Sequence, residues 1–368
     1  MEQATHNARL RQLIREVSSA AAPESDRETL LAAVQLIRDF NGPLRFDNRT
    51  PLFIGVFATL LFIAVIAFAQ WGSPEAKHWL TSVATMKYDG VLLLAGVFAL
   101  VTLTASFGFM WHRRNLLPTT SEDIARQSSR LTAGLISHTT PRQRLLLDLS
   151  SHFGDYARGN YSRELTQALQ AVYPGALHEL YYSYFQLHYV NKRIVTTTES
   201  DGKGGRRTVT RTVYDHYDRY SLVVEFPWVE GITARTGNGS GLDFEHHYQT
   251  ASTDFNKAFA LSGSSTMACA KFAKPVTVLH LLAMHRQLKG MNLEFSFDGR
   301  LCISFENSNM LDFDMPCDLY DAEQFYRYIE TGARLPHLEK VLELVHTLAE
   351  QHDDNFNLPT ASVQYEEH

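Results

Sequence analysis

Two long apolar runs near the start of the chain constrain its fold more than any other feature. No charged residue occurs from Thr50 to Pro74, and none occurs from Gly90 to Trp111. A helix rises about 1.5 Å per residue, so about 20 apolar residues cross the hydrocarbon core of a bilayer. Because a backbone in lipid must satisfy its own hydrogen bonds, both runs are expected to be helical. The sequence therefore predicts two transmembrane helices with a short external loop, a helical hairpin over residues 51–111.

Two other interpretations of the apolar runs are less favourable. A pair of buried helices in a soluble protein is disfavoured because few soluble helices stay free of charge over such a length. A signal peptide is disfavoured because a long polar segment precedes the first run. Trp71 and Trp111 lie at the ends of the runs, where indole rings prefer the interface between membrane and water.

Basic residues indicate the orientation of the two spans. They concentrate on the outer flanks of the pair, as Arg38, Arg45, Arg49, Arg113, Arg114 and Arg126, whereas the connecting loop carries Lys77 and Lys87. An excess of Lys and Arg marks the cytoplasmic side, so both termini are predicted to be cytoplasmic.

The overall composition limits the class of protein. The chain has 368 residues, of which 45% are hydrophobic and 20% charged, and this excludes a disordered or collagen-like chain. A net charge of -6 argues against a globally basic protein that binds nucleic acid. The three cysteines, Cys269, Cys302 and Cys317, cannot make a disulfide framework and suit a reducing cytosol.

Hydrophobic periodicity divides the chain into four predicted parts. Cytosolic N-terminal helices occupy residues 1–50, the spans 51–111, a cytosolic α+β domain 112–352 and a flexible tail 353–368. In the first part, Leu10, Ile14 and Val17 repeat at helical spacing. Ser25 and Glu28 form a capping-box pattern that opens a second helix.

The α+β domain is predicted to begin with helices and to continue with strands. The helical segments are Ser121 to about Ile136 after a connector at Leu116–Ser121, a helix from Pro141, and Ser162–Val172. Aromatic and β-branched residues then predict strands over Tyr181–Thr198, Val209–Tyr214 and Arg219–Phe226. These strands are expected to form an antiparallel sheet flanked by helices.

The last third of the domain shows a clear hairpin between helices. Apolar residues alternate on both sides of Asp298-Gly299, which predicts a two-residue type I′ turn. Before it we expect a loop over Gly231–Gly241, a strand over Phe255–Leu261 and a helix from Pro275. After it, helices are expected from Asp321 and from Pro336.

The order of these elements resembles a known family. The segment Asp254-Phe255-Asn256-Lys257-Ala258-Phe259, the helix from Pro275 and the strand Leu301-Cys302-Ile303-Ser304-Phe305-Glu306 resemble the bacterial membrane proteins of the DUF3137 domain of unknown function. The segment Tyr217–Leu222 lacks a glycine expected in that family, so the chain is identified as a divergent member. The resemblance implies residence in the bacterial inner membrane and supplies no catalytic residue.

No sequence pattern predicts a catalytic centre, a metal site or a cofactor. The glycines and lysine of residues 202–205 lack the strand, helix and Gly-Lys-Ser/Thr ending of a phosphate-binding loop. Adjacent His246 and His247 point in different directions and rarely share one metal with Asp243 or Glu245. Cys302 lies inside a predicted strand and is interpreted as a small packing residue.

One charged feature is a candidate binding surface. Six basic residues concentrate on the first predicted strand pair and its turn: Lys192, Arg193, Lys203, Arg206, Arg207 and Arg211. They could meet anionic lipid headgroups or an acidic protein surface. An ordinary solvated hairpin with charge-protected edges is the favoured alternative.

The sequence as a whole predicts a membrane-anchored cytosolic binding or scaffold module with an unknown protein partner. The alternatives are a membrane-tethered sensor of a small ligand and a hydrolase or metalloenzyme whose site residues are distant in sequence. The partners expected are the bilayer and a protein, with no nucleic acid. Small residues at Ala95, Gly96 and Ala99 in the second span would also permit close packing in a homo-oligomer.

Overall fold

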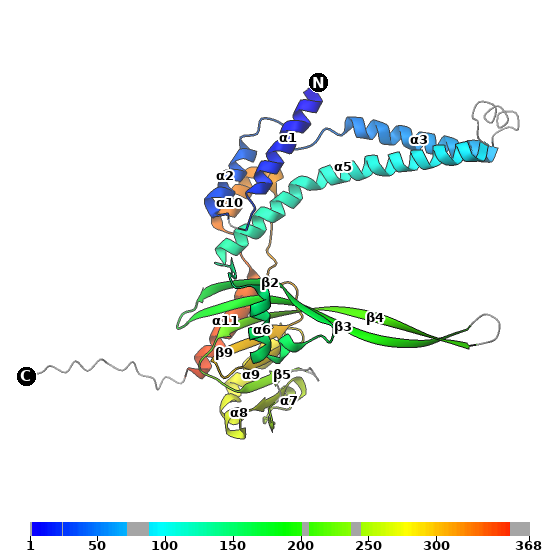
Figure 1. The fold of residues 1–368 in the computed structure, drawn as a ribbon. Helices are drawn as coiled ribbons and strands as arrows, with labels where there is room; N and C mark the ends of the chain where they lie inside the picture. Colours follow the sequence, from blue (N-terminus) through cyan, green and yellow to red (C-terminus); the bar gives the residue numbers. More distant parts are fainter. Residues whose placement is uncertain (1, 24, 72–87, 201–205, 237–243, 354–368) are drawn as a thin grey trace, which may run out of the picture. The chain divides into compact units, whose positions relative to one another are not determined.

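The computed structural model describes residues 2–23, 25–71, 88–200, 206–236 and 244–353 (Figure 1). Contacts between Cα atoms divide the chain into two compact units. One, here named the helical unit, comprises residues 1–131 and 314–333, and the other, the sheet unit, comprises residues 132–313 and 334–368. The chain therefore leaves the helical unit, returns to it for residues 314–333 and ends in the sheet unit.

The helical unit consists of helices from both ends of the chain. They are α1 (Glu2–Ser19), α2 (Arg27–Arg38), α3 (Arg49–Trp71), α5 (Tyr88–Thr132), the 3₁₀ helix η2 (Leu319–Asp321) and α10 (Ala322–Thr331). Both α1 and α10 pack on α2, and fully buried side chains such as Leu30 and Phe325 fill the space between them. The N-cap of α2 is Asp26, which accepts a hydrogen bond from Thr29 N–H at 2.9 Å, so the predicted capping box at Ser25 is wrong by one residue.

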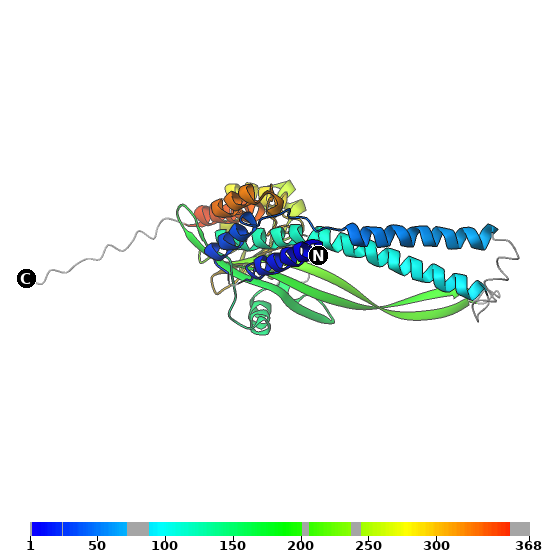
Figure 2. The ribbon, with the colours of Figure 1, turned by 90° about the horizontal axis from the view of Figure 1, so that it is seen from above.

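Two helices among the described residues are long and apolar enough to cross a membrane. They are α3, with a mean hydropathy of 2.8, and the part of α5 from Leu92 onward, with 2.1. Only 11% of each apolar window is buried within the protein, so most of these side chains face outward. The predicted pair of apolar helices is therefore confirmed, and both views show α3 and α5 running alongside each other (Figures 1 and 2).

Small residues let α3 and α5 approach closely. A Cβ atom on Gly55 would lie 3.4 Å from the ring of Phe107, and one on Gly96 would lie 3.6 Å from Val65. Ala58 and Ala99 are buried nearby. The small residues that would permit an oligomer thus pack, at Gly96 and Ala99, inside the hairpin itself.

The long helix α5 contradicts the predicted connector at Leu116–Ser121. It continues through Pro118 as one helix of 45 residues. Proline removes one backbone donor and normally breaks a helix. Here Leu117 and Ile124 are buried, and Ser121 Oγ donates to Leu117 O at 2.8 Å and accepts from Leu319 N–H at 3.0 Å. Packing within the helical unit therefore outweighs the local penalty of the proline.

The sheet unit confirms an α+β fold with an antiparallel sheet. Its described strands form one nine-stranded sheet in the order β1-β2-β3-β4-β9-β8-β5-β7-β6. The strands are β1 (Ile136–Ser137), β2 (Ser162–Pro174), β3 (Glu179–Ser200), β4 (Arg206–Glu225), β5 (Ile232–Arg235), β6 (His246–Tyr248), β7 (Ala260–Gly263), β8 (Asn292–Phe295) and β9 (Arg300–Phe305). All pairings between them are antiparallel.

Helices cover both faces of the sheet. One face packs on α7 (Thr253–Ala258), α8 (Thr266–Phe272), α9 (Pro275–His285) and α11 (Pro336–His352), and includes the main hydrophobic core. The other face packs on α6 (Arg142–His152) and the 3₁₀ helix η1 (Gly154–Ala157) through a smaller core around Phe153, Phe185 and Val223. The apolar helices α8 and α9, bent by 74° to each other, bury Phe272 and Leu281 in the main core, which explains their hydropathy without a membrane.

The predicted helix over Ser162–Val172 is wrong, because the segment forms strand β2. A bulge between Leu165 and Gln167 shifts the register of β2 against β3. Leu165 and Ala168 consequently both reach the smaller core, and Leu169 reaches the main core. In sequence these three positions imitate helical spacing, and only the bulge makes them compatible with a strand.

Three further local predictions need correction. Residues 231–241 were expected to be a loop, but strand β5 forms within them. A strand was expected over Phe255–Leu261, but the short helix α7, capped by Ser252, occupies the first part of this segment, so strand β7 begins only at Ala260. The β8–β9 turn is not type I′, since no described residue other than glycine has a positive φ. Ser296 N–H donates to Arg300 O at 2.9 Å, and Gly299 has φ +76°. The connection is therefore a three-residue turn that ends with a left-handed glycine.

Candidate functional site

The predicted basic hairpin is a two-stranded ribbon that extends beyond the sheet (Figures 1 and 2). Strand β2 pairs with β3 only as far as Val190, and β9 pairs with β4 only from Tyr220 onward. Between these limits β3 and β4 pair with each other alone, up to Ser200 opposite Arg206. We name residues 191–200 and 206–215 the arm.

The described basic residues of the arm lie on both of its faces. Lys192 and Arg193 are neighbours in β3, so their side chains project from opposite faces. Arg193 Nε contacts Asp215 Oδ2 at 2.6 Å, which partly neutralises it. Arg211 lies opposite Val195, and Arg206 and Arg207 take the last two register positions, opposite Ser200 and Glu199. Lys203 lies outside the described residues.

One face of the arm carries exposed aromatic and aliphatic side chains. Tyr214 lies directly opposite Lys192, and its ring centroid is 4.9 Å from that of Tyr161. Lys192 Nζ lies 5.9 Å from the Tyr161 ring, and Ile194 is 68% exposed. We name Lys192, Ile194 and Tyr214 of the arm, together with Tyr161 just before β2, the aromatic face of the arm.

A groove of about 470 Å³ lies between α6 and the sheet. Its floor contains Leu149, Phe185 and Val223, which belong to the smaller core. Its polar lining includes His138, whose ring nitrogen Nε2 is 2.9 Å from Ser183 Oγ. Burial lowers the pKa of His138, so this imidazole is neutral near pH 7. Such a combination of apolar floor and few polar groups suits a small ligand.

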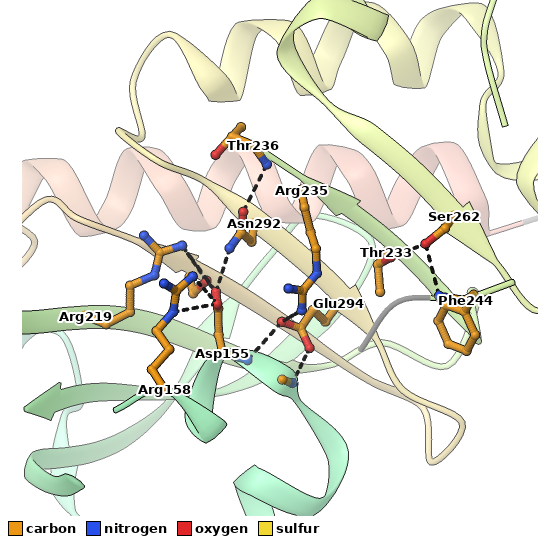
Figure 3. Close-up of polar contacts among 12 residues, drawn as sticks. Asp155, Arg158, Arg219, Thr233, Arg235, Thr236, Phe244, Ser262, Asn292 and Glu294 are labelled. Atoms are coloured by element: carbon orange, nitrogen blue, oxygen red, sulfur yellow. Dashed lines mark hydrogen bonds and ion pairs between the residues drawn. The ribbon is translucent and has the colours of Figure 1, made fainter. Parts of the chain in front are cut away.

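A cluster of buried charges lies beside the smaller core (Figure 3). Its centre is the carboxylate of Asp155 in η1, of which only 1% is exposed. Arg219 Nη2 and Asn292 Nδ2 donate to Asp155 Oδ2 at 3.2 and 2.9 Å, and Arg158 Nε donates to Oδ1 at 2.8 Å. Ser304 Oγ also donates to this carboxylate.

The second carboxylate of the cluster, Glu294 in β8, links η1 to β5. It accepts hydrogen bonds from the backbone N–H groups of Gly154 at 2.6 Å and Asp155 at 3.2 Å. Arg235 Nη2 lies 2.5 Å from Glu294 Oε1. Because the backbone donors of η1 have no intrahelical partner, a buried carboxylate at this end stabilises the turn.

The two carboxylates have oppositely shifted pKa values. Burial, together with the charge of Asp155, raises the pKa of Glu294 to about 7, although Arg235 opposes the shift. Burial would also raise the pKa of Asp155, but the charges of Arg219 and Arg158 outweigh it and lower that pKa below its usual value. Opposite shifts of this kind occur in acid–base pairs of enzymes.

The geometry nevertheless favours a structural role for the cluster. Asp155, Arg219, Arg235 and Glu294 are all buried, and none of them lines the groove under α6. Contacts of Asp155 and Glu294 join η1 to strands β4, β8 and β9, and the ion pair of Arg235 with Glu294 joins β5 to β8. The cluster therefore holds η1 on the sheet.

Sequence reasoning missed this cluster because its residues are far apart in the chain. One signal was present: Asn292 and Glu294 alternate with Leu293 and Phe295. Only the apolar members of this alternation were used to predict the strand, whereas all four side chains are buried. A charged residue within such a short apolar strand is thus compatible with burial, provided that a partner lies elsewhere in the chain.

Other predicted candidates take ordinary structural positions. Among the described residues, no group of three or more His, Cys, Asp and Glu side chains could hold a metal ion. Burial raises the pKa of the Cys302 thiol well above its usual value, which opposes a nucleophilic role.

Comparison with known protein families, with curated proteins and with solved structures finds no match for this chain. The resemblance to the DUF3137 membrane proteins therefore stays a prediction.

Proposed function

We propose that this protein is a membrane-anchored binding module whose arm docks on a partner protein. Helix α3 and the apolar part of α5 anchor it as two spans, and the sheet unit carries the arm on the cytoplasmic side. The basic flanks of the two spans support this orientation. The resemblance stated above supports the bacterial inner membrane as the location.

The observation that carries the proposal is the exposure of the arm. A two-stranded ribbon without a third strand or a covering helix gains little stability from its own burial. The arm nevertheless presents Ile194 and Tyr214 to solvent, at 68% and 44% exposure. Tyrosine is enriched in protein interfaces, and an exposed apolar patch rimmed by polar residues marks such surfaces.

The chemistry of the arm fits a protein surface better than a lipid surface. Lys192 and Arg193 project from opposite faces, and Arg193 is ion-paired with Asp215. A lipid-binding arm would instead concentrate unpaired positive charge on one face. The mixed aromatic and polar face matches the composition of protein–protein contacts.

A photocrosslinking amino acid at position 194 tests the proposal in native membranes. We expect the full-length protein carrying it to form one discrete protein adduct. The matched control places the same residue at Leu147, which is 72% exposed on α6. Identical adducts from both positions, or lipid adducts alone from position 194, would contradict docking through the arm.

A second candidate function, sensing of a small ligand, is supported by the groove under α6. Its volume of about 470 Å³ falls within the range of small-molecule sites. A ligand that binds only the folded protein raises its melting temperature. We expect such a rise to disappear in Ser183→Trp, whose position faces His138 in the groove, and to persist in the exposed control Ala176→Trp.

A further inference from the structure

A second pocket, in the helical unit, lies where the apolar pair of helices meets basic residues. Its volume is about 680 Å³. The basic residues that line it are Arg45, Arg113 and Arg114. Its polar and aromatic lining includes Asn48, Trp111 and Tyr320. The pocket is therefore built from the segment before α3, the middle of α5 and the returning segment before α10.

The pocket holds positive charge without a compensating carboxylate. No Asp or Glu among the described residues lines it. No ion pair to a described carboxylate is formed by Arg45, Arg113 or Arg114. Three guanidinium groups around one space repel one another, so an anion bound among them would be stabilised.

Arg113 is the most constrained of the three guanidinium groups. It lies 4.1 Å from the ring centroid of Phe109 and 5.3 Å from that of Phe46. Its Nη1 has only long hydrogen bonds, 3.3 Å to Asn48 Oδ1 and 3.4 Å to Asp47 O. Its buried Nε has no hydrogen-bond partner among the described residues. The aromatic rings thus hold the guanidinium in place while its donors are incompletely used.

The surroundings of the pocket indicate which anion it would bind. Phe107 and Trp111 also line it, and they are 48% and 69% exposed. Both belong to the outward-facing apolar part of α5, where a bilayer's acyl chains would lie. A ligand with an anionic head and apolar tails would satisfy both parts of the lining, whereas a soluble anion would satisfy only the arginines.

A neighbouring pocket is a poorer candidate for the same ligand. It has a volume of about 790 Å³ and shares Arg113, but Asp47 also lines it. A carboxylate in the lining repels a phosphate and partly cancels the charge of Arg11 and Arg113. Of these two pockets, the one with Arg45 and Arg114 is therefore the better candidate for an anionic ligand.

We propose that the pocket around Arg45, Arg113 and Arg114 binds the phosphate headgroup of an anionic phospholipid. This site fixes the depth of the two spans and requires that they lie in a bilayer. It does not require that the arm binds a protein, so the two proposals are tested separately.

Lipid titration of the full-length protein in detergent, read by native mass spectrometry, tests the site. The probes are phosphatidylglycerol, phosphatidylcholine and inorganic phosphate. We expect half-saturation by phosphatidylglycerol at a concentration at least about ten-fold lower than by phosphatidylcholine, since each basic residue contributes to anionic lipid binding. The triple variant Arg45→Gln/Arg113→Gln/Arg114→Gln should lose this preference.

Matched variants keep the test decisive. The control Arg9→Gln/Arg15→Gln/Arg144→Gln removes the same charge from exposed positions and should keep the preference. If the pocket triple variant fails to fold, the single variant Arg114→Gln replaces it. This variant should fold, because the exposed side chain of Arg114 has no hydrogen bond among those described, and it should weaken the preference for phosphatidylglycerol. Equal binding of both lipids by the wild type, an equal loss in the control, or phosphate that displaces the lipid at millimolar concentration would overturn the proposal.

Discussion

The two halves of the β3–β4 pair share one pattern of backbone pairing but differ in everything around it. At the base, Tyr182, Tyr184, Leu222 and Val224 are each at most 4% exposed. There β2 and β9 pair on either side, and helices pack on the faces. Among the described residues, the same two strands have in the arm no further strand beside them and no helix packed on their faces. Burial, not strand pairing, is therefore what separates the structural half from the half available for binding.

The largest expected contrast concerns one carboxylate beside the base and one in the arm. Asp155→Ala leaves Arg219 buried without its partner, which should destabilise the sheet unit by about 3–5 kcal/mol. Asp215→Ala removes the exposed ion pair with Arg193, which solvent screens, so its effect on stability should be far smaller. Hydrogen exchange of β4 amides in the full-length protein in detergent measures both. Equal effects of the two substitutions would refute a structural role for the buried cluster.

A slightly smaller contrast is expected for apolar side chains. Leu222→Ala empties a fully buried position in the main core and should destabilise the sheet unit by about 3 kcal/mol. The matched change Ile194→Ala in the arm should alter stability by less than about 0.5 kcal/mol. The same exchange measurement applies to both. Strong destabilisation by Ile194→Ala would mean that the free protein already covers the arm.

The pH dependence of stability should reveal the buried cluster beside the base of the β3–β4 pair. Because the pKa of Glu294 is raised to about 7 in the folded protein, its folded form retains a proton that the unfolded form releases above its usual pKa. This contribution to stability is present at low pH and is lost as the pH rises towards 7. We expect about 2 kcal/mol less stability from this group at pH 8 than at pH 5.

Glu294→Gln should flatten this part of the profile, because glutamine does not titrate in that range. The substitution also removes the charge facing Arg235, so the slope with pH and not the absolute stability is the readout. Urea unfolding of the full-length protein at pH 5, 6.5 and 8 measures it. An unchanged slope in the variant would show that Glu294 is ionised throughout.

The smallest effect on stability is expected at the end of the arm. Arg206→Glu/Arg207→Glu should change stability by less than about 0.5 kcal/mol, since these positions have only β3 beside them. Crosslinking from position 194 should fall several-fold in this variant. If the basic residues meet an acidic protein surface, the introduced carboxylates are repelled by that surface and docking is weakened. Crosslinking that stays unchanged would remove the basic residues from the contact and leave the aromatic face.

The sequence predicted those elements whose pattern is local. The two apolar helices, the strands around Tyr184 and Leu222, and the hairpin at Gly299 all follow from composition or alternation. Strand β2 did not, because a single bulge gives Leu165, Ala168 and Leu169 helical spacing. Helix α5 did not either, because the packing that tolerates Pro118 involves Leu319, almost 200 positions further along the chain.

The candidate sites were predicted less well than the fold, for related reasons. The arm was found as a basic hairpin, but the alternation of a strand separates Lys192 from Arg193, and the exposed Tyr214 was not singled out. The pocket at Arg113 joins three distant segments through Tyr320. Each of its arginines was noted only as an indicator of orientation. Sites assembled from distant segments require the tertiary structure before their residues can be grouped.

The return of the chain to the helical unit has a consequence for biosynthesis. Residues 322–331 form α10, whose Phe325 and Ile329 are buried where it packs on α2. A ribosome makes α2 early and α10 only after nearly the whole sheet unit has been synthesised. The apolar side of α2 therefore stays incomplete during most of translation, when a chaperone or the bilayer surface must cover it. A chain truncated at residue 313 would keep both apolar helices but would lack α10, the partner of α2.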